Sequence, residues 1–265
     1  MPISSPHQDR TYAVTGAASG IGAAVARYLT LRGGRVIACD LTEGDVAADL
    51  ATPDGRARLV EAVARLSGGR LDGIVANAGG GPPETMLALN FFGAVATLAG
   101  LRPLLAGGDA PRAVAVSSVS SLGQADPRIV EACLAGDEAA TGAAAAEAMA
   151  AGLSPLDLYG VAKHALNRWC RREAPTDAWA GAATPLNVVA PGVIETPAAA
   201  WILSDPENRA RMRNMTPLPG ACPGRPEAMA ALVAWCVGPE NALLTGQVLF
   251  ADGGLECAAR GELRW

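Results

Sequence analysis

Tyr159 and Lys163 stand four positions apart in Leu153–Asn167, a stretch whose composition favours a helix. On an α-helix this spacing places both side chains on one face, about one turn apart. A phenol beside an ammonium can act in acid/base chemistry, because a nearby cation favours the phenolate and lowers the pKa of the phenol from about 10. Lys163 is also the only lysine of the chain, and every other long basic side chain is an arginine. A compact ammonium differs chemically from a planar guanidinium, which indicates a specific role for Lys163.

A glycine-rich loop near the N-terminus is the second chemical signature. Tyr12–Thr15 predicts a short apolar strand, and the sequence GAASGIG at 16–22 separates it from a predicted helix over Ala23–Leu31. A loop of this kind lets the backbone approach a pyrophosphate and directs the N–H groups of a helix N-terminus towards it. The glycine spacing differs from the common GxGxxG pattern, so the loop by itself is also compatible with a tight turn.

The next predicted strand, Arg35–Cys39, ends at Asp40. A carboxylate at the end of this strand can accept hydrogen bonds from an adenosine ribose and would repel a 2′-phosphate. No Arg or Lys occurs at positions 17–19 or 41–43 to receive such a phosphate. These residues predict NAD as the cofactor in preference to NADP.

Predicted strands and helices alternate along the rest of the chain without a repeat or a linker. The remaining strands are expected at Val46–Leu50, Leu71–Ala76, Arg112–Ser117, Leu186–Ala190 and Gln247–Ala251, and helices at Asp54–Leu66, Pro83–Ala106, Pro206–Asn214 and Glu227–Val237. This alternation predicts an α/β fold, a single domain over residues 1–265 with a doubly wound parallel sheet of the Rossmann type and helices on both faces. The alanine-rich stretch at about 124–155 predicts a helical insertion before Tyr159.

Asn90 and a cluster of serines are further candidates for a functional role. Asn90 lies inside the predicted helix Pro83–Ala106, where an asparagine needs a partner for its amide; a core role and a functional role both remain open. Ser117, Ser118, Ser120 and Ser121 follow a predicted strand. The carboxyl ends of parallel strands are the usual position of a ligand.

Composition excludes several other classes of function. A net charge of −5 and a pI near 5.1 differ from the basic character of a nucleic-acid-binding protein. The six cysteines form no CxxC pair and no group with His7 or His164, so neither a metal site nor a disulfide framework is expected. The N-terminal residues lack an apolar targeting segment and no run of 18 apolar residues occurs, so we expect a cytoplasmic protein without a membrane partner.

Taken in order along the chain, these motifs resemble the short-chain dehydrogenase/reductase family. The motifs are TGAASGIG, Asp40, NAG at 77–79, Asn90, the serine cluster, YGVAK, PGVIET and the final DGG. The long stretch before Tyr159 is unusual in the family and is similar to that of the bacterial 3α-hydroxysteroid dehydrogenase/carbonyl reductases. Many members of the family form tetramers through the helix that carries the tyrosine, and the insertion precedes that helix. We therefore expect a homodimer or homotetramer in which the usual contact is blocked or replaced.

The resemblance implies a role for each matching residue. It implies that the pyrophosphate and ribose are bound by Gly16, Ser19, Gly20, Ile21 and Gly22. The adenosine ribose would be bound by Asp40, and the adenine by Asp49 and Leu50. Asn77, Ala78 and Gly79 would lie near the cofactor ribose, Tyr159 and Lys163 at the nicotinamide ribose, and Ile194 and Thr196 at the carboxamide. It also implies a catalytic tetrad of Ser118, Tyr159, Lys163 and Asn90, with Ser118 chosen because the family's serine is the second of such a pair.

The expected reaction is the reversible oxidation of a secondary alcohol to a ketone. Tyr159 would be the general base, Ser118 would hold the substrate oxygen, and Asn90 would fix a water that passes the proton to solvent. Residues 197–222 are expected to form a lid over the substrate. The lid's apolar residues, among them Trp201, Met212 and Met215, could line a wide cleft for a bulky alicyclic substrate such as a steroid or terpenoid. Packing of the lid or a subunit contact explains them equally well.

Two other functions are compatible with the same fold. A regulator or scaffold could bind the nucleotide without turnover, because a fold does not fix a function. A lyase or dehalogenase could use the scaffold without a nucleotide site. The intact tetrad disfavours the first alternative, and the glycines together with Asp40 disfavour the second.

Overall fold

A seven-stranded parallel sheet forms the centre of the computed structural model, which describes residues 5–262. The strand order is β3-β2-β1-β4-β5-β6-β7, and the strands are β1 (Thr11–Thr15), β2 (Arg35–Asp40), β3 (Val46–Ala47), β4 (Gly73–Ala76), β5 (Arg112–Val116), β6 (Leu186–Pro191) and β7 (Val248–Ala251). Every residue of β4, β5 and β6 is buried, which explains their continuous apolar sequences. The strand order reverses between β1 and β4, and this is the place where doubly wound sheets bind ligands.

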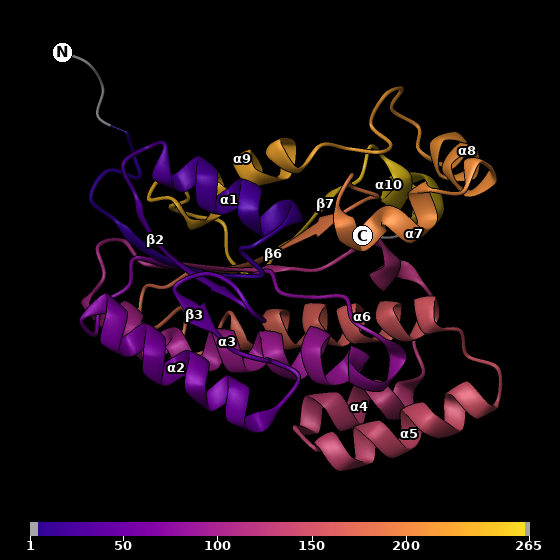
Figure 1. The fold of residues 1–265 in the computed structure, drawn as a ribbon, viewed down its shortest axis with the longest axis horizontal. Coiled ribbons are helices and arrows are strands. Elements are labelled where there is room, and N and C mark those ends of the chain that lie inside the picture. The colour runs from indigo at the N-terminus through magenta and orange to yellow at the C-terminus, as the bar shows by residue number, and fades with distance from the viewer. Residues whose placement is uncertain (1–4, 263–265) are drawn as a thin grey trace.

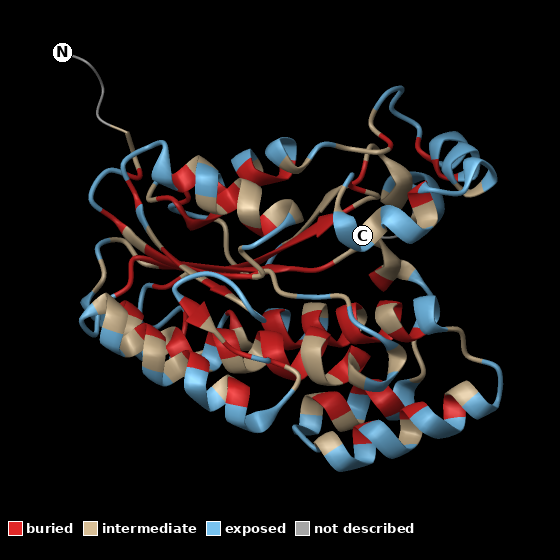
Figure 2. Cartoon of the chain, viewed as in Figure 1, coloured by how far each residue is buried: buried red, intermediate tan, exposed pale blue. Residues whose placement is uncertain are grey.

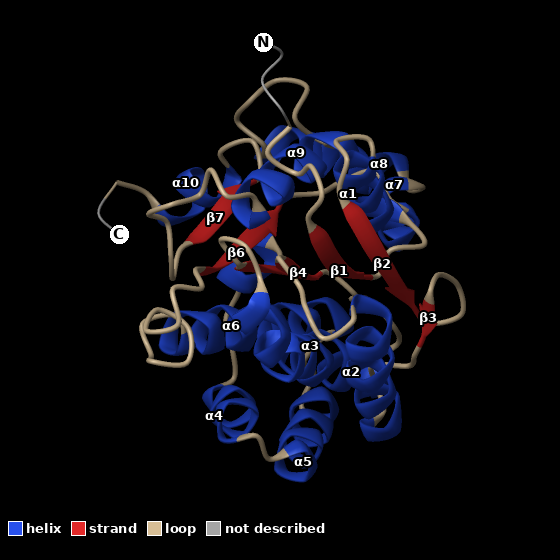
Figure 3. Ribbon diagram, turned by 90° about the vertical axis from the view of Figure 1, so that its left-hand side faces the viewer, coloured by secondary structure: helices blue, strands red, loops and turns tan. Residues whose placement is uncertain are grey.

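Helices cover both faces of the sheet (Figure 1; Figure 3). One face carries α1 (Gly20–Thr30) and α9 (Pro226–Val237), and the other carries α2 (Pro53–Ser67), α3 (Ala94–Leu101) and α6 (Pro155–Glu173). Figure 2 shows the buried residues on the sheet and on the helix sides that face it, with exposed residues on the outside. The predicted doubly wound α/β architecture is confirmed.

The predicted helical insertion consists of two helices, α4 (Pro127–Ala135) and α5 (Glu138–Ala150). Each begins at an aspartate whose side chain accepts a hydrogen bond from the first turn, Asp126 from the backbone N–H of Arg128 and Asp137 from that of Ala140. The left-handed Gly136 (φ 75°) separates the two helices. Helix α4 packs on α6, so the pair forms an additional layer outside the helices that cover the sheet (Figure 3).

The prediction of one continuous helix over Pro83–Ala106 is wrong. The segment is divided into a 3₁₀ turn (Pro83–Thr85), a π-helix (Ala88–Gly93), α3 and a second 3₁₀ turn (Arg102–Gly107). Asn90 lies in the π-helix, and its amide nitrogen donates to the carbonyl oxygen of Met86 at 2.8 Å. A side chain that enters the helical hydrogen-bond ladder favours such a local widening.

The predicted strand Val46–Leu50 is also too long, because β3 contains only Val46 and Ala47. The carbonyl of Asp49 accepts a hydrogen bond from the backbone N–H of Thr52, and the carbonyl of Leu50 accepts one from the Arg56 side chain. These carbonyls are therefore directed away from the sheet, and the backbone after Ala47 forms a loop.

The segment Ala88–Gly107 is long and apolar enough to cross a membrane when judged by length and composition alone. Half of its most apolar window is buried within the protein, and α3 packs against α2 and β4. Its apolar character is therefore accounted for by its position in the core beneath the sheet.

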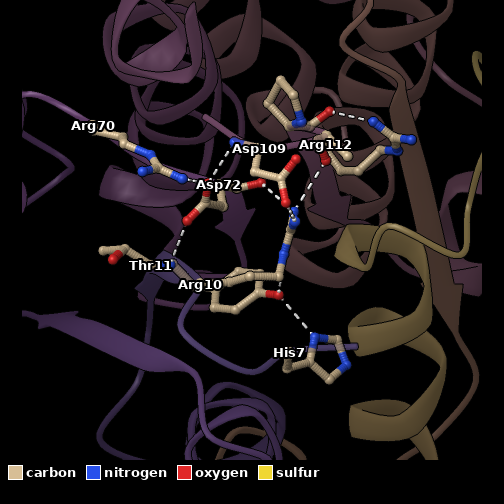
Figure 4. Close-up of polar contacts among 10 residues, drawn as sticks. His7, Arg10, Thr11, Arg70, Asp72, Asp109 and Arg112 are labelled. Carbon is tan, nitrogen blue, oxygen red and sulfur yellow. Dashed lines mark hydrogen bonds and ion pairs between the residues drawn. The ribbon is translucent and has the colours of Figure 1, made fainter. Parts of the chain in front are cut away.

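A buried polar network joins the amino ends of β1, β4 and β5 (Figure 4). Arg10 donates to the hydroxyl of Tyr12 at 2.9 Å and to the carbonyls of Asp72 and Ala110. Burial lowers the pKa of His7 to about 4, so its neutral ring can accept the Tyr12 hydroxyl at 2.8 Å. This network fixes the amino ends of β1, β4 and β5, at the edge of the sheet opposite the carboxyl ends of the strands.

Candidate active site

The glycine-rich loop after β1 is held against the loop after β4. Asn77 donates through its amide nitrogen to the carbonyls of Thr15 and Gly16, at 3.1 and 3.3 Å. The Thr15 hydroxyl oxygen accepts from the backbone N–H groups of Asn77 and Ala78, at 3.0 and 3.1 Å. Thr15 was not among the residues expected in the site, although a threonine at the end of a buried strand could have indicated such a role.

Two glycines of this loop are required by their surroundings. A Cβ built on Gly22 would lie 2.0 Å from the Gly16 carbonyl oxygen, so any side chain would displace the loop. Gly16 itself has a φ of +67°, in the left-handed region that favours glycine. The loop thus reaches the first turn of α1 without side chains between them.

The N-terminus of α1 presents free donors beside this loop. The preceding residue, Ser19, is exposed and makes no capping hydrogen bond with its side chain. Backbone N–H groups in a first helical turn together with the helix dipole favour an anion. Ser19, Gly20, Ile21 and Gly22 can therefore hold a pyrophosphate, and the arrangement fits a dinucleotide.

Asp40 ends β2 directly beside the glycine-rich loop. One of its carboxylate oxygens accepts the backbone N–H of Ala18 at 2.8 Å, and the other accepts that of Leu41 at 2.7 Å. The side chain is half-buried, and its remaining lone pairs can accept ribose hydroxyls. Asp49 and Leu50 follow at the neighbouring strand end, with Leu50 buried and Asp49 exposed.

Tyr159 and Ser118 face each other across the contact between α6 and the turn after β5. A Cβ built on Gly160 would lie 2.6 Å from the Ser120 carbonyl oxygen, so the glycine allows α6 to approach this turn closely. Burial raises the pKa of Tyr159, and its interaction with the Ser118 side chain opposes that rise. Ser117, in contrast, is buried and its hydroxyl donates to the Lys163 carbonyl at 3.3 Å. The orientation of the two serines supports the choice of Ser118.

Lys163 is 2% exposed and has no carboxylate partner among the ion pairs of residues 5–262. Its Nζ donates to the Val116 carbonyl at 3.0 Å and lies 5.6 Å from the centroid of the Tyr159 ring. Burial lowers the pKa of Lys163 to about 8. For Tyr159 the effect of burial dominates, so the lowered phenol pKa expected from the Tyr/Lys spacing is not found in the protein alone.

The side chains of Asn90 and Lys163 both approach the backbone of Gly79. A Cβ built on Gly79 would lie 2.8 Å from Asn90 Oδ1 and 3.2 Å from Lys163 Nζ. Asn90 is completely buried, and it accepts the backbone N–H of Gly80 at 3.0 Å and donates to the Gly80 carbonyl at 2.8 Å. Its amide therefore shapes the loop after β4, and the water-holding role stays a prediction.

Thr196 approaches the glycine-rich loop from the segment after β6. A Cβ built on Gly20 would lie 3.0 Å from the Thr196 methyl carbon, and Ile194 is buried just before it. The expected lid follows, with helices α7 (Ala200–Leu203) and α8 (Pro206–Met215). Figure 1 shows these helices near α10 (Leu255–Arg260), at one end of the sheet.

The apolar lid residues differ in exposure. Trp201 is 60% exposed and Met215 is 51% exposed, whereas Met212 is buried. A cleft of about 550 Å³ at the base of the lid is lined by other residues, including Glu195, Arg213 and Arg225. A substrate-binding role for Trp201, Met212 and Met215 therefore stays a prediction, and sequence reasoning did not single out the charged residues of this cleft.

Together these groups lie at the carboxyl ends of the strands, in an arrangement that could transfer a proton and hold a dinucleotide. Tyr159, Ser118, Lys163 and Asn90 come from three separate segments and gather beside the loop after β4. The glycine-rich loop, Asp40 and Thr196 lie along the neighbouring strand ends. Within residues 5–262 no group of three or more His, Cys, Asp or Glu side chains could hold a metal ion.

Comparisons with known proteins agree with this geometry. The family model described as enoyl-(acyl carrier protein) reductase matches residues 16–256. The chain is 33% identical over 254 residues to the 3-alpha-hydroxysteroid dehydrogenase/carbonyl reductase of Comamonas testosteroni, covering 93% of this chain and 96% of that protein. It is 30% identical to the cis-4-hydroxycyclohexanecarboxylate dehydrogenase of Sinomonas cyclohexanicum, covering 93% of this chain and 96% of the relative.

A solved structure is similar over nearly the same length. The crystal structure of the 3-alpha-hydroxysteroid dehydrogenase from Pseudomonas sp. B-0831 complexed with NADH superimposes with a TM-score of 0.85 and 38% sequence identity. The match covers 94% of this chain and 98% of that structure.

Proposed function

This chain belongs to the short-chain dehydrogenase/reductase family of oxidoreductases, and on that premise we propose that it interconverts a secondary alcohol and a ketone with NAD as cofactor. The observation that carries the proposal is the gathering of Tyr159, Ser118 and Lys163 beside a glycine-rich loop that fits a dinucleotide. The similar structure that contains NADH supports the choice of cofactor.

The cofactor site would extend along the strand ends from β3 to β6. The pyrophosphate would lie at Gly16, Ser19, Gly20, Ile21 and Gly22, the adenosine ribose at Asp40, the adenine at Asp49 and Leu50, the nicotinamide ribose at Asn77, Ala78, Gly79, Tyr159 and Lys163, and the carboxamide at Ile194 and Thr196. NAD would supply the hydride acceptor for the reaction.

Tyr159 is the general base of the proposed reaction. Its phenolate oxygen takes the hydroxyl proton of the alcohol, and the Ser118 hydroxyl holds the substrate oxygen beside it. Because burial raises the phenol's pKa, the phenolate needs positive charge nearby, which Lys163 and an oxidised nicotinamide would provide together.

The substrate class is proposed to be a bulky apolar alicyclic alcohol or ketone, in line with the hydroxysteroid and hydroxycyclohexane names of two relatives. We expect kcat/KM for a steroid alcohol to exceed that for a sugar alcohol by about 100-fold, because the apolar lid residues proposed to contact the substrate would leave sugar hydroxyls unpaired. Initial rates of NAD reduction with a steroid alcohol, a monocyclic terpenoid alcohol and a sugar alcohol measure this. A preference for the sugar alcohol would contradict the substrate class, although dehydrogenase activity would stand.

Cofactor selectivity is the second expected result. Asp40 should make kcat/KM for NAD exceed that for NADP by roughly 100-fold, because its carboxylate would lie beside the extra 2′-phosphate. Asp40→Ala should reduce this ratio, and Asp45→Ala, at another carboxylate near the same strand end, is the matched control. Equal use of both cofactors by the unmodified protein would refute the role of Asp40.

Titration of NADH fluorescence with the protein separates the proposal from the two alternatives. A scaffold would bind NADH without turnover, and a lyase or dehalogenase would not bind it.

We also propose a cytoplasmic homodimer or homotetramer. The six free cysteines, five of them buried, agree with a reducing compartment.

A further inference from the structure

We infer that Arg56 is a positioning residue for the adenine end of the cofactor site, and that the inserted segment holds Arg56 in place through Glu138. The loop concerned is residues 48–52, between β3 and α2. The inference rests on the proposed function, because Asp49 and Leu50 of this loop are proposed there to contact the adenine. It gives the insertion a role in cofactor affinity.

Arg56 binds the backbone of that loop directly. Its Nε donates to the Leu50 carbonyl at 2.9 Å, and its Nη2 donates to the Ala51 carbonyl at 3.1 Å. These carbonyls follow the last residue of β3, so the sheet does not satisfy them. The guanidinium therefore replaces the missing strand partner and determines the path of the loop.

Glu138, in the first turn of α5, holds the same guanidinium from the other side. Arg56 Nη1 donates to Glu138 Oε2 at 2.8 Å, and Nη2 donates to Oε1 at 2.6 Å. The pair is bidentate, an arrangement that fixes the plane of the guanidinium as well as its position. The Arg56 side chain is 12% exposed and that of Glu138 is 40% exposed, so water screens this pair only in part. Figure 1 shows the first turns of α2 and α5 side by side below the sheet.

The π-helical turn supports the loop from a third direction. A Cβ built on Gly93 would lie 3.0 Å from both the Cβ and the carbonyl oxygen of Leu50. The guanidinium carbon of Arg56 lies 5.7 Å from the ring centroid of Phe92, the neighbouring residue in that turn. Leu50 is therefore held between Arg56 and the π-helix, and loss of Arg56 would free one side of the loop.

This arrangement predicts an effect on the adenine end of the cofactor alone. None of the hydrogen bonds of Arg56 reaches Ser118, Tyr159 or Lys163. Affinity for ligands that contain adenine should fall when Arg56 is replaced, while the rate of the bound complex should not change.

The test is the affinity for ADP-ribose, measured by calorimetry on the full-length protein. We expect Arg56→Gln and Arg56→Lys to weaken it by about tenfold and Glu138→Gln by about threefold, because the loop loses direct bonds in the first two and only their support in the third. The kcat at saturating NAD should stay within about twofold in all three. Glu131→Gln is the matched control, since it breaks a pair between the insertion and Arg168 of α6 at 2.7 Å, away from this loop.

The outcomes are distinct. Unchanged ADP-ribose affinity in the Arg56 variants would overturn the role of Arg56, and an unchanged value in Glu138→Gln would overturn that of the insertion. An equal loss in Glu131→Gln would show general loosening of the insertion and would also contradict the inference. If the Arg56 variants do not fold, Glu138→Gln decides. Wild-type protein that binds ADP-ribose but oxidises no alcohol would refute the proposed reaction alone, whereas failure to bind ADP-ribose would refute both.

Discussion

Tyr159→Phe is expected to lower kcat for alcohol oxidation by about 1,000-fold or more, because it removes the proton acceptor while the aromatic ring stays in place. The ring is half-buried at the contact of α6 with the Ser118 turn, and phenylalanine fills the same space. Binding of NADH, followed by its fluorescence, should therefore stay near that of the wild type. Initial rates of NAD reduction at saturating alcohol measure the loss.

The pH profile gives a second readout for this variant. The base is the phenolate, so wild-type alcohol oxidation should increase as the pH rises through the pKa that Tyr159 has in the complex with NAD, where Lys163 and the nicotinamide oppose the upward effect of burial. The residual rate of Tyr159→Phe should lack this increase. Tyr28→Phe, at a half-buried tyrosine on α1 stacked with Arg32, is the matched control and should keep full activity. Substantial turnover by Tyr159→Phe would refute the assignment of the base.

Lys163→Arg is expected to lower kcat/KM by about 100-fold although it keeps the positive charge. Lys163 is almost completely buried, with its Nζ between the Val116 carbonyl and the Gly79 backbone. A guanidinium is larger and planar, so it would displace the loop at Gly79 or turn away from it. Both outcomes weaken the contact with the nicotinamide ribose, so the dissociation constant of NADH should also rise.

The matched control for this exchange lies on the same helix. Arg168 is exposed on α6 and pairs with Glu131, so Arg168→Lys swaps the same two residue types without entering the site. It should leave kcat/KM within about twofold of the wild type. Wild-type activity in Lys163→Arg would show that positive charge alone is sufficient at this position. The thermal unfolding midpoint of each variant separates a loss of chemistry from a loss of folding.

The elements that carry the proposed cofactor site followed from sequence because their signals are local. The strand, the glycine-rich loop and the helix are contiguous, and Asp40 ends the next strand, so periodicity and turn residues were enough to place them. The same holds for Tyr159 and Lys163, whose spacing on one helix fixes their common face. Apolar runs identified the buried strands for the same reason.

Contacts between distant segments were decided only by the tertiary structure. The π-helical turn at Asn90 depends on hydrogen bonds to Met86 and Gly80, and helical periodicity alone predicts a continuous helix there. Whether Ser117 or Ser118 faces the tyrosine depends on how α6 packs against the turn after β5. Spacing reveals the charge beside Tyr159 but not the degree of its burial, and burial raises the pKa of this phenol in the protein without cofactor, so the expected lowering stays a prediction for the complex with NAD. Arg56 and Glu138 lie 82 positions apart, and no local pattern relates them, since only the folded chain brings α2 and the insertion together.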